Sequence, residues 1–133
     1  MTLATMELQH ALATKLQGDG VLAGLVNGLY DAPPQGAALP YLVFGEGEAR
    51  IVPAEGPVLT ETALEIEVWT DTSGRKTALM ILNRLYALLH YGTLSLTGFQ
   101  QVVLRVEQSS ISLTEEATRL RGGLRVVATL VEA

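Results

Sequence analysis

Two pairs of carboxylates are the first candidates for chemistry in this sequence. Glu46 and Glu48 form one pair, and Glu65 and Glu67 form the other, each spaced i, i+2 within a predicted strand. Alternate residues of a strand point to the same face, so each pair could supply a general acid and a general base. The same spacing is typical of a sheet face that meets solvent or another subunit, and we favour that interpretation.

Other catalytic or ligating side chains lack partners at useful spacing. His10 and His90 lie on separate predicted helices, without a carboxylate or a second histidine at ligand spacing. The absence of cysteine excludes a disulfide, a thiolate metal site and a cysteine nucleophile. Gly45-Glu46-Gly47 and Gly74-Arg75-Lys76 are only fragments of phosphate-loop patterns. We therefore assign no catalytic residue, no cofactor and no metal ligand.

Arginines and the single tryptophan on predicted strand faces are candidates for protein contacts. Arg119, Arg121 and Arg125 form a one-sided basic stripe, while Trp69 lies on the polar face of its strand. An exposed aromatic residue on such a face is a candidate interface anchor. The arginines either contact an acidic surface of a partner or pair across strands, which we favour, with Glu107, Glu115 and Glu116.

A stiff segment over residues 29–41 connects the N-terminal helices to the first long strand. Pro33 and Pro34 fix φ and lack amide donors, and the residue before each proline is pushed toward extended geometry. The segment can therefore be neither a helix nor a central strand. We expect it to be an ordered connector that packs against the core or a neighbouring subunit.

The elements that must position these residues follow from hydrophobic periodicity. Apolar residues at helical spacing, including Met6, predict a helix that Thr5 caps and that ends at residues 18–20. The remaining predicted helices are residues 21–26 and 75–90, the second ending with Gly92 as a left-handed C-cap.

Strands are predicted over residues 41–50, where Gly45 and Gly47 suggest a bulge or the close approach of another backbone, and over residues 62–70, 94–96, 100–112 and 119–132. The clearest strand, residues 62–70, has one face made of Thr62, Leu64, Ile66, Val68 and Thr70. The clearest helix, residues 75–90, has an apolar stripe made of Ala78, Ile81, Leu82, Leu85, Leu88 and Leu89.

The last predicted strands form a long hairpin, with its tip at residues 114–118 and its first strand projecting past the sheet. Val102, Leu104 and Val106 are expected to share the core face of that strand. The order of elements predicts an α+β fold, in which an antiparallel sheet of four to five strands has helices packed on one face.

Composition limits the class of protein. With 133 residues, 48% of them apolar, the chain is expected to be a single domain, residues 1–133, whose excess apolar surface is covered by other subunits. No apolar run is long enough to cross a bilayer, so we expect no membrane association and a protein made in the cytoplasm. A net charge of −5 with scattered basic residues argues against nucleic-acid binding.

Several sequence blocks together resemble the phage tail-completion proteins that act as tail terminators, including those of gene transfer agents. The most specific block is Tyr30-Asp31-Ala32-Pro33-Pro34-Gln35-Gly36-Ala37-Ala38-Leu39-Pro40-Tyr41. The others are Leu64-Glu65-Ile66-Glu67-Val68-Trp69 followed by Gly74-Arg75, Leu96-Thr97-Gly98, Val103-Leu104-Arg105-Val106-Glu107 and Gly122-Gly123-Leu124-Arg125-Val126. One departure is the hairpin tip at residues 114–118, where many relatives have a tight Asp-Gly type turn.

The resemblance implies a structural protein of a virion or phage-like particle, assembled in the bacterial cytoplasm, that catalyses no reaction. It implies a homo-oligomer, expected to be a hexameric ring, which caps the head-proximal end of the tail tube and terminates its polymerisation. The implied partners are the tail tube protein and the head-tail connector, with DNA only passing through the lumen. The interface candidates are Tyr30, Asp31, Pro33, Pro34, Gln35, Trp69, Arg119, Arg121 and Arg125, and the candidates for an acidic lumen or inter-subunit face are Glu46, Glu48, Glu65 and Glu67.

Two alternatives remain open at this point. The first is another structural role in the same particle, as a head-tail connector or adaptor or as a tube-like subunit. The second is a small α+β enzyme or ligand-binding domain that uses the paired glutamates.

Overall fold

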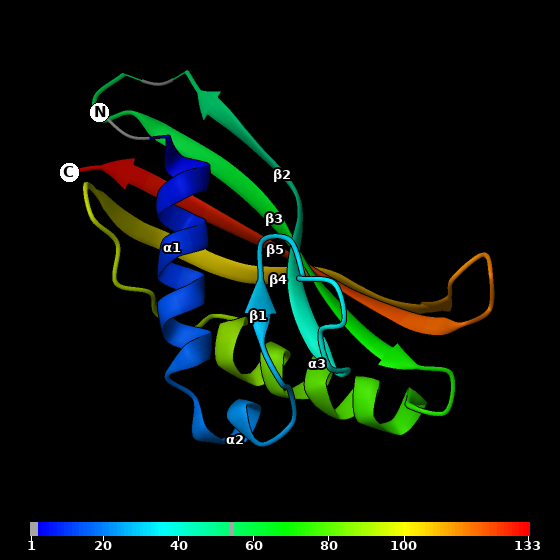
Figure 1. Ribbon diagram of the computed structural model, residues 1–133. Helices are drawn as coiled ribbons and strands as arrows, with labels where there is room; N and C mark the ends of the chain where they lie inside the picture. Colours follow the sequence, from blue (N-terminus) through cyan, green and yellow to red (C-terminus); the bar gives the residue numbers. More distant parts are fainter. Residues whose placement is uncertain (1–2, 54) are drawn as a thin grey trace.

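The computed structural model describes residues 3–53 and 55–133, and it has the predicted α+β architecture (Figure 1). The helices are α1 (Ala4–Gln17), α2 (Gly20–Ala23) and α3 (Arg75–Leu89). The strands are β1 (Leu29–Tyr30), β2 (Tyr41–Val52), β3 (Leu59–Asp71), β4 (Phe99–Leu113) and β5 (Arg119–Glu132). They form one five-stranded sheet in the order β1-β2-β3-β5-β4, antiparallel except for the short parallel pair of β1 and β2.

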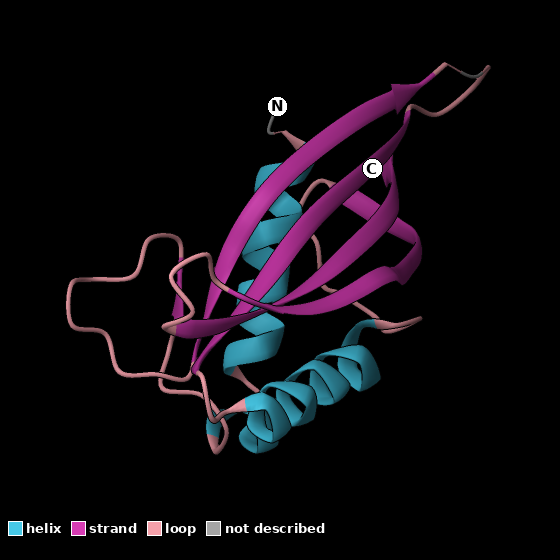
Figure 2. Cartoon of the chain, turned by 90° about the vertical axis from the view of Figure 1, so that its right-hand side faces the viewer, coloured by secondary structure: helices cyan, strands magenta, loops and turns pink. Residues whose placement is uncertain are grey.

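The hydrophobic core lies between one face of this sheet and the helices. On β3, the predicted alternation is confirmed, since the side chains that face the helices are at most 2% exposed: Thr62, Leu64, Ile66, Val68 and Thr70. On α3, the predicted apolar stripe is also confirmed, although Leu88 is only half-buried. α1 packs on β2 and β3 while α3 packs on β3, β4 and β5, so helices cover a single face of the sheet. Figure 2 shows how strongly that sheet is twisted.

Three register irregularities shape the long strands, one in β2 and two in β4. The glycine-containing stretch of β2 is irregular between Phe44 and Gly47, as the sequence predicted. In β4 the register shifts between Gln101 and Val103 and again between Val106 and Gln108, which the sequence did not reveal. Val102 is the extra residue at the first of these shifts and is 59% exposed, so its placement on the core face was wrong. Leu104 is buried as expected, and Val106 is half-buried.

Several local predictions at the helix ends were wrong. α1 begins at Ala4 with Leu3 as its N-cap, so Thr5 lies inside the helix and its Oγ1 atom contacts Thr62 Oγ1 at 3.3 Å. Met6 is 68% exposed, not buried. The left-handed residue after α3 is Tyr91, with a φ of 56°, and not Gly92.

Two predictions about strands also need correction. Residues 94–96 form no strand, so two strands and not three follow α3. The first strand of the final hairpin does not project past the sheet, because β3 accompanies β5 as far as the pair Asp71 and Arg119. Only the tip at residues 114–118 extends beyond the paired strands. None of the helices described in this structure is long and apolar enough to cross a membrane.

The corner between α2 and α3 is fixed by Asp19. Its carboxylate caps α2 by accepting a hydrogen bond from the Leu22 amide at 2.8 Å. Arg84 of α3 donates to both carboxylate oxygens, from Nε at 2.9 Å and from Nη2 at 2.6 Å. These donors, Arg84 first and the Leu22 amide second, lower the pKa of Asp19 from 3.8 to about 2.

This shift predicts a pH-dependent contribution to stability. A carboxylate whose pKa is lower in the folded state stabilises the fold above its unfolded pKa, and that contribution is lost as the pH falls through the folded value. We therefore expect Asp19→Asn, which keeps the cap but removes the charge, to be less stable than the wild type at pH 7. The difference should shrink between pH 4 and pH 2, as measured by urea unfolding at each pH. Asp19→Ala, which also removes the cap, should be less stable than Asp19→Asn at pH 7, and equal stability would contradict the capping role.

Candidate assembly surfaces

The face of the sheet that no described helix covers carries a network of ion pairs. At its centre, Arg121 of β5 reaches across to β3, where its Nη2 atom donates to Glu65 and, at 2.9 Å, to Glu67 Oε2. The Arg121 side chain is 36% exposed, whereas Glu65 and Glu67 are 28% and 17% exposed. The carboxylates, Glu67 first, raise the pKa of Arg121. Both members of this glutamate pair are therefore held by one charged guanidinium.

A second group of ion pairs lies farther along the same face. Arg125 donates to Glu48 Oε1 from Nη2 at 2.7 Å and to Glu107 Oε1 from Nε at 3.2 Å. Its pKa is raised, mainly by the hydrogen bond to Glu48. Cross-strand pairing was thus correct for Arg125 and Glu107, but Arg121 pairs with residues of β3 that the sequence did not suggest. Arg119 donates to the Tyr41 hydroxyl at 3.0 Å.

This arrangement is that of a structural ion-pair network. A shallow hollow of about 340 Å³ beside Arg125 is lined by Glu48, Ala49, Arg50, Glu61, Ala63, Glu107, Arg125 and Val127. Its carboxylates are distributed among arginines and do not converge on one point. Among the described residues, no group of three or more histidine and acidic side chains could hold a metal ion. Of the histidines, His10 is exposed, and His90 Nδ1 accepts a hydrogen bond from the Val106 amide at 3.0 Å.

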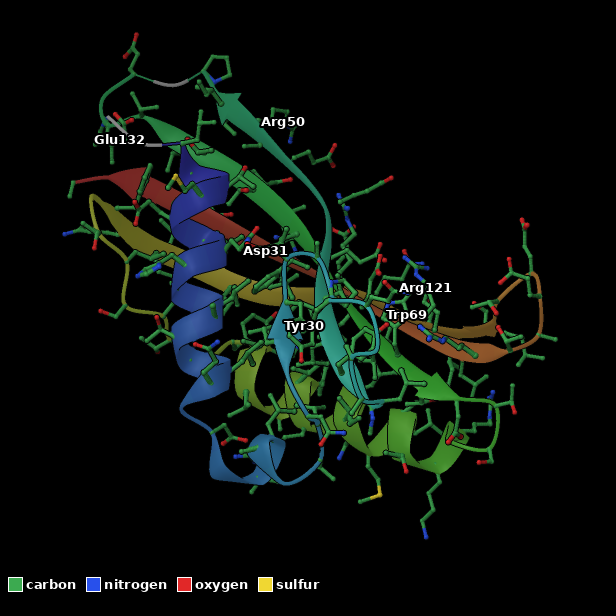
Figure 3. All side chains as sticks on the ribbon, viewed as in Figure 1. Tyr30, Asp31, Arg50, Trp69, Arg121 and Glu132 are labelled. Carbon is green, nitrogen blue, oxygen red and sulfur yellow. The ribbon has the colours of Figure 1, made fainter. Side chains whose placement is uncertain are left out.

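Aromatic side chains extend the charged network toward β1. Trp69 is paired in register with Tyr41 on one side and with Arg121 on the other, and Figure 3 shows Trp69 and Arg121 side by side. The Trp69 Nε1 atom donates to Glu67 Oε1 at 3.0 Å, which ties the indole to the ion pairs. Tyr30 meets Tyr41 edge to face, with ring centroids 5.7 Å apart. Trp69 and Tyr30 are half-buried, so part of each ring is open to contact.

The segment between β1 and β2 forms a loop that is held at its base. Asn27 closes the loop, because its backbone nitrogen donates to Pro40 O at 2.8 Å and its side-chain Nδ2 atom donates to Leu39 O at 2.9 Å. A turn from Pro34 to Ala37 is closed by a 3.0 Å hydrogen bond, with Gly36 at a φ of 80°. Residues 31–36 are all exposed, and Asp31 is the one charged residue among them. Asp31 Oδ1 accepts a hydrogen bond from Gln9 Nε2 of α1 at 2.5 Å.

The interface candidates therefore lie in two places. Trp69, Arg119, Arg121 and Arg125 are on the helix-free sheet face, with Tyr30 at its border, whereas Asp31, Pro33, Pro34 and Gln35 are on the loop. Sequence reasoning missed a groove of about 600 Å³ between α1 and the β1–β2 edge. Leu3 and Met6 border it and are 78% and 68% exposed. The one sequence signal was the apolar character of these two residues at the start of α1.

Comparison with known proteins gave one matching family model and several similar solved structures, among them a gene transfer agent chain and a bacteriophage protein. Residues 10–132 match the family model described as "Tail completion protein gp17". A chain of a structure titled "Virion of native gene transfer agent (GTA) particle" is 26% identical, with a TM-score of 0.88 over 98% of this chain and 99% of that chain. The gp17 protein of bacteriophage SPP1 is 23% identical, with a TM-score of 0.65 over 96% of this chain and 91% of that chain, and it shows a shared fold. No curated protein matched the sequence.

Proposed function

Because the chain belongs to the tail completion protein gp17 family, we propose that it forms a hexameric ring that caps the head-proximal end of a phage-like tail tube. The ring terminates tube polymerisation and joins the tail to the head connector. The observation that carries this proposal is the match, over 98% of the chain, to a chain of a gene transfer agent particle. The protein then acts in the neck of such a particle and has a structural, not an enzymatic, role.

The physical features of the chain are compatible with a ring. Several large apolar side chains are exposed on its surface, including Leu3, Met6, Ile51 and Leu113, and subunit contacts would cover some of them. We keep Glu46, Glu48, Glu65 and Glu67 as candidates for a face that lines the lumen. Three of these carboxylates are paired with Arg121 or Arg125, so that face would be less acidic than the glutamates alone suggest. A nearly neutral polar face would still lack the positive charge that binds DNA phosphates, so DNA could pass through the lumen.

The mass of the assembled species tests this proposal. Sedimentation and native mass measurements, with and without the cognate tail tube protein, should detect a six-subunit species. When added to growing tubes, the protein should shorten them and appear only at one end. A chain that stays monomeric in both conditions would contradict the proposal, and open stacks of this chain would indicate a tube-like subunit instead.

The proline loop gives a second test. Pro33 and Pro34 are exposed, and the loop is anchored by Asn27 outside the proline pair, so we propose that these prolines stiffen a subunit-contact arm. Replacing both with glycine should weaken ring assembly more than it lowers the free energy of unfolding of the monomer. Native mass titration measures the first quantity and urea denaturation the second. Equal losses in both would show that the loop serves only the monomer fold.

A further inference from the structure

The outer edge of β4 is covered over half of its length by the connector that follows α3. Leu104 O accepts a hydrogen bond from the Tyr91 amide at 2.8 Å, and the Val106 amide donates to His90 Nδ1 at 3.0 Å. The Gln101 side chain donates to Gly92 O at 2.7 Å and accepts from the Leu94 amide at 2.9 Å. The His90 ring stacks on Tyr86 at a centroid distance of 4.7 Å, which fixes its position. These contacts occupy the outward backbone groups of Leu104 and Val106, so a further strand cannot pair with β4 there.

The other half of the β4 edge has no such cover. Residues 108–113 are Gln-Ser-Ser-Ile-Ser-Leu, without a charge or a proline, and β5 is the strand that pairs with them in the described structure. Among the hydrogen bonds of the described residues, none from outside the hairpin reaches this segment. Edge strands are usually protected by charges, prolines or covering loops, because their free amides and carbonyls can bind another strand. An uncharged, uncovered edge of this length indicates that an extended segment of a partner adds to the sheet as a further strand.

The opposite edge of the sheet offers a matching free segment. β1 pairs with β2 at Leu42 and Val43, and the bulge follows immediately, so within the described part of the chain residues 47–52 have a sheet neighbour on the β3 side alone. The two free segments also carry similar types of residue on each side of the sheet. Ile51 of β2 and Leu113 of β4 are 68% and 56% exposed, and both lie on the helix side of the sheet. On the other side lie polar residues, Arg50 of β2 and Ser110 of β4.

We propose that residues 108–113 of one copy pair antiparallel with residues 47–52 of the next copy, so that the sheet continues from subunit to subunit. This inference rests on the proposed ring and specifies its contact. The two segments lie on opposite edges of the sheet, which makes the contact head-to-tail, the kind that closes into a ring. In this register Ile111 of one copy lies opposite Ala49 and diagonal to the exposed Ile51 of the next copy, on the helix side of the sheet, so pairing removes apolar surface from water.

The strand register within one subunit determines how far the next subunit must be shifted along the strand direction for the two free segments to pair. Ser110 is level with Gly123, Glu67 and Val43 across the sheet, whereas the centre of the free β2 segment is near Ala49 and Arg50. Counted along β3, which pairs with both positions of β2, that offset is five to six residues, or about 18 Å, while the four long strands span about 19 Å. The ratio corresponds to a strand tilt of roughly 45°, at the upper end of the tilt of about 35–45° in closed barrels. The contact is thus compatible with a closed ring of tilted strands.

Cysteine cross-linking tests the contact directly, because the chain contains no cysteine. Arg50→Cys and Ser110→Cys place one thiol on each free edge, both on the helix-free face. With a short bis-maleimide, a mixture of these two variants should give a covalent dimer under ring-forming conditions, whereas each variant alone should not. The double variant should give a ladder that ends at the size of the ring. Val102→Cys is the matched control, since Val102 is 59% exposed on the covered half of β4 and should not cross-link to Arg50→Cys.

A second variant blocks the same edge. Ser110→Lys with Ser112→Lys should raise the subunit concentration needed for half-assembly at least about tenfold, because charges on an edge strand oppose pairing. Far-UV circular dichroism and the urea midpoint should stay unchanged. Rings that form without the Arg50–Ser110 cross-link, or that persist in the lysine variant, would overturn this contact but leave the ring proposal intact. A wild-type chain that never assembles with tube protein would overturn both.

Discussion

Replacing Arg121 with methionine is expected to lower the free energy of unfolding by about 2 kcal/mol, measured by urea denaturation at pH 7. Arg121 is the shared partner of Glu65 and Glu67, which lie two residues apart on the same face of β3. Methionine fills a similar volume but leaves two neighbouring carboxylates without their counterion. The expected loss is smaller than for a fully buried pair, because the Arg121 side chain is 36% exposed and water screens part of the interaction.

Two further variants separate this effect from general surface electrostatics. Arg50→Met removes an ion pair at 3.7 Å to Glu61 in which the arginine is 76% exposed, so it should cost at most about 0.5 kcal/mol. Adding Glu65→Gln and Glu67→Gln to Arg121→Met removes the uncompensated charges and should recover part of the lost stability. If Arg121→Met costs no more than Arg50→Met, the ion pairs on this face do not support the fold.

The sequence predicted those elements whose pattern is complete within one strand or helix. Strict alternation over β3 and the apolar stripe of α3 each report burial on one face, and the structure confirms both. Same-face spacing also predicted correctly that Glu65 and Glu67 would lie together. It could not supply their partner, because that depends on β5 lying beside β3, a neighbour more than fifty residues away in the sequence. Long-range strand order leaves no local signal.

Irregular backbone explains most of the remaining errors. A single extra residue in β4 reverses the expected side of Val102, and no residue type in that stretch marks the bulge. β1 is only two residues long and was not predicted, since a pair so short has no periodicity. The proline-rich segment was predicted correctly as irregular because its φ restriction is a property of the residues themselves. Its role as a contact arm remains a prediction.

The sequence pattern predicted the wrong structural role for Gly92. The expected role was a left-handed C-cap, but the structure gives the positive φ to Tyr91. Gly92 is required instead by a close approach of two backbone segments. A Cβ atom added there would lie 2.2 Å from Leu88 O, in the last turn of α3, and 3.4 Å from Lys15 Nζ of α1. The Gly92 carbonyl also accepts the Gln101 hydrogen bond that holds the connector on the edge of β4.

Gly92→Ala is therefore expected to cost about 2–3 kcal/mol of unfolding free energy, because the contact is with a carbonyl of the helix backbone that cannot rotate away. The matched control is Gly20→Ala at the start of α2, where no atom lies within 4 Å of the added Cβ. It should be neutral or stabilising by up to about 1 kcal/mol. Urea unfolding of both variants compares them directly, and similar stabilities would show that α3 and the connector can separate at little cost.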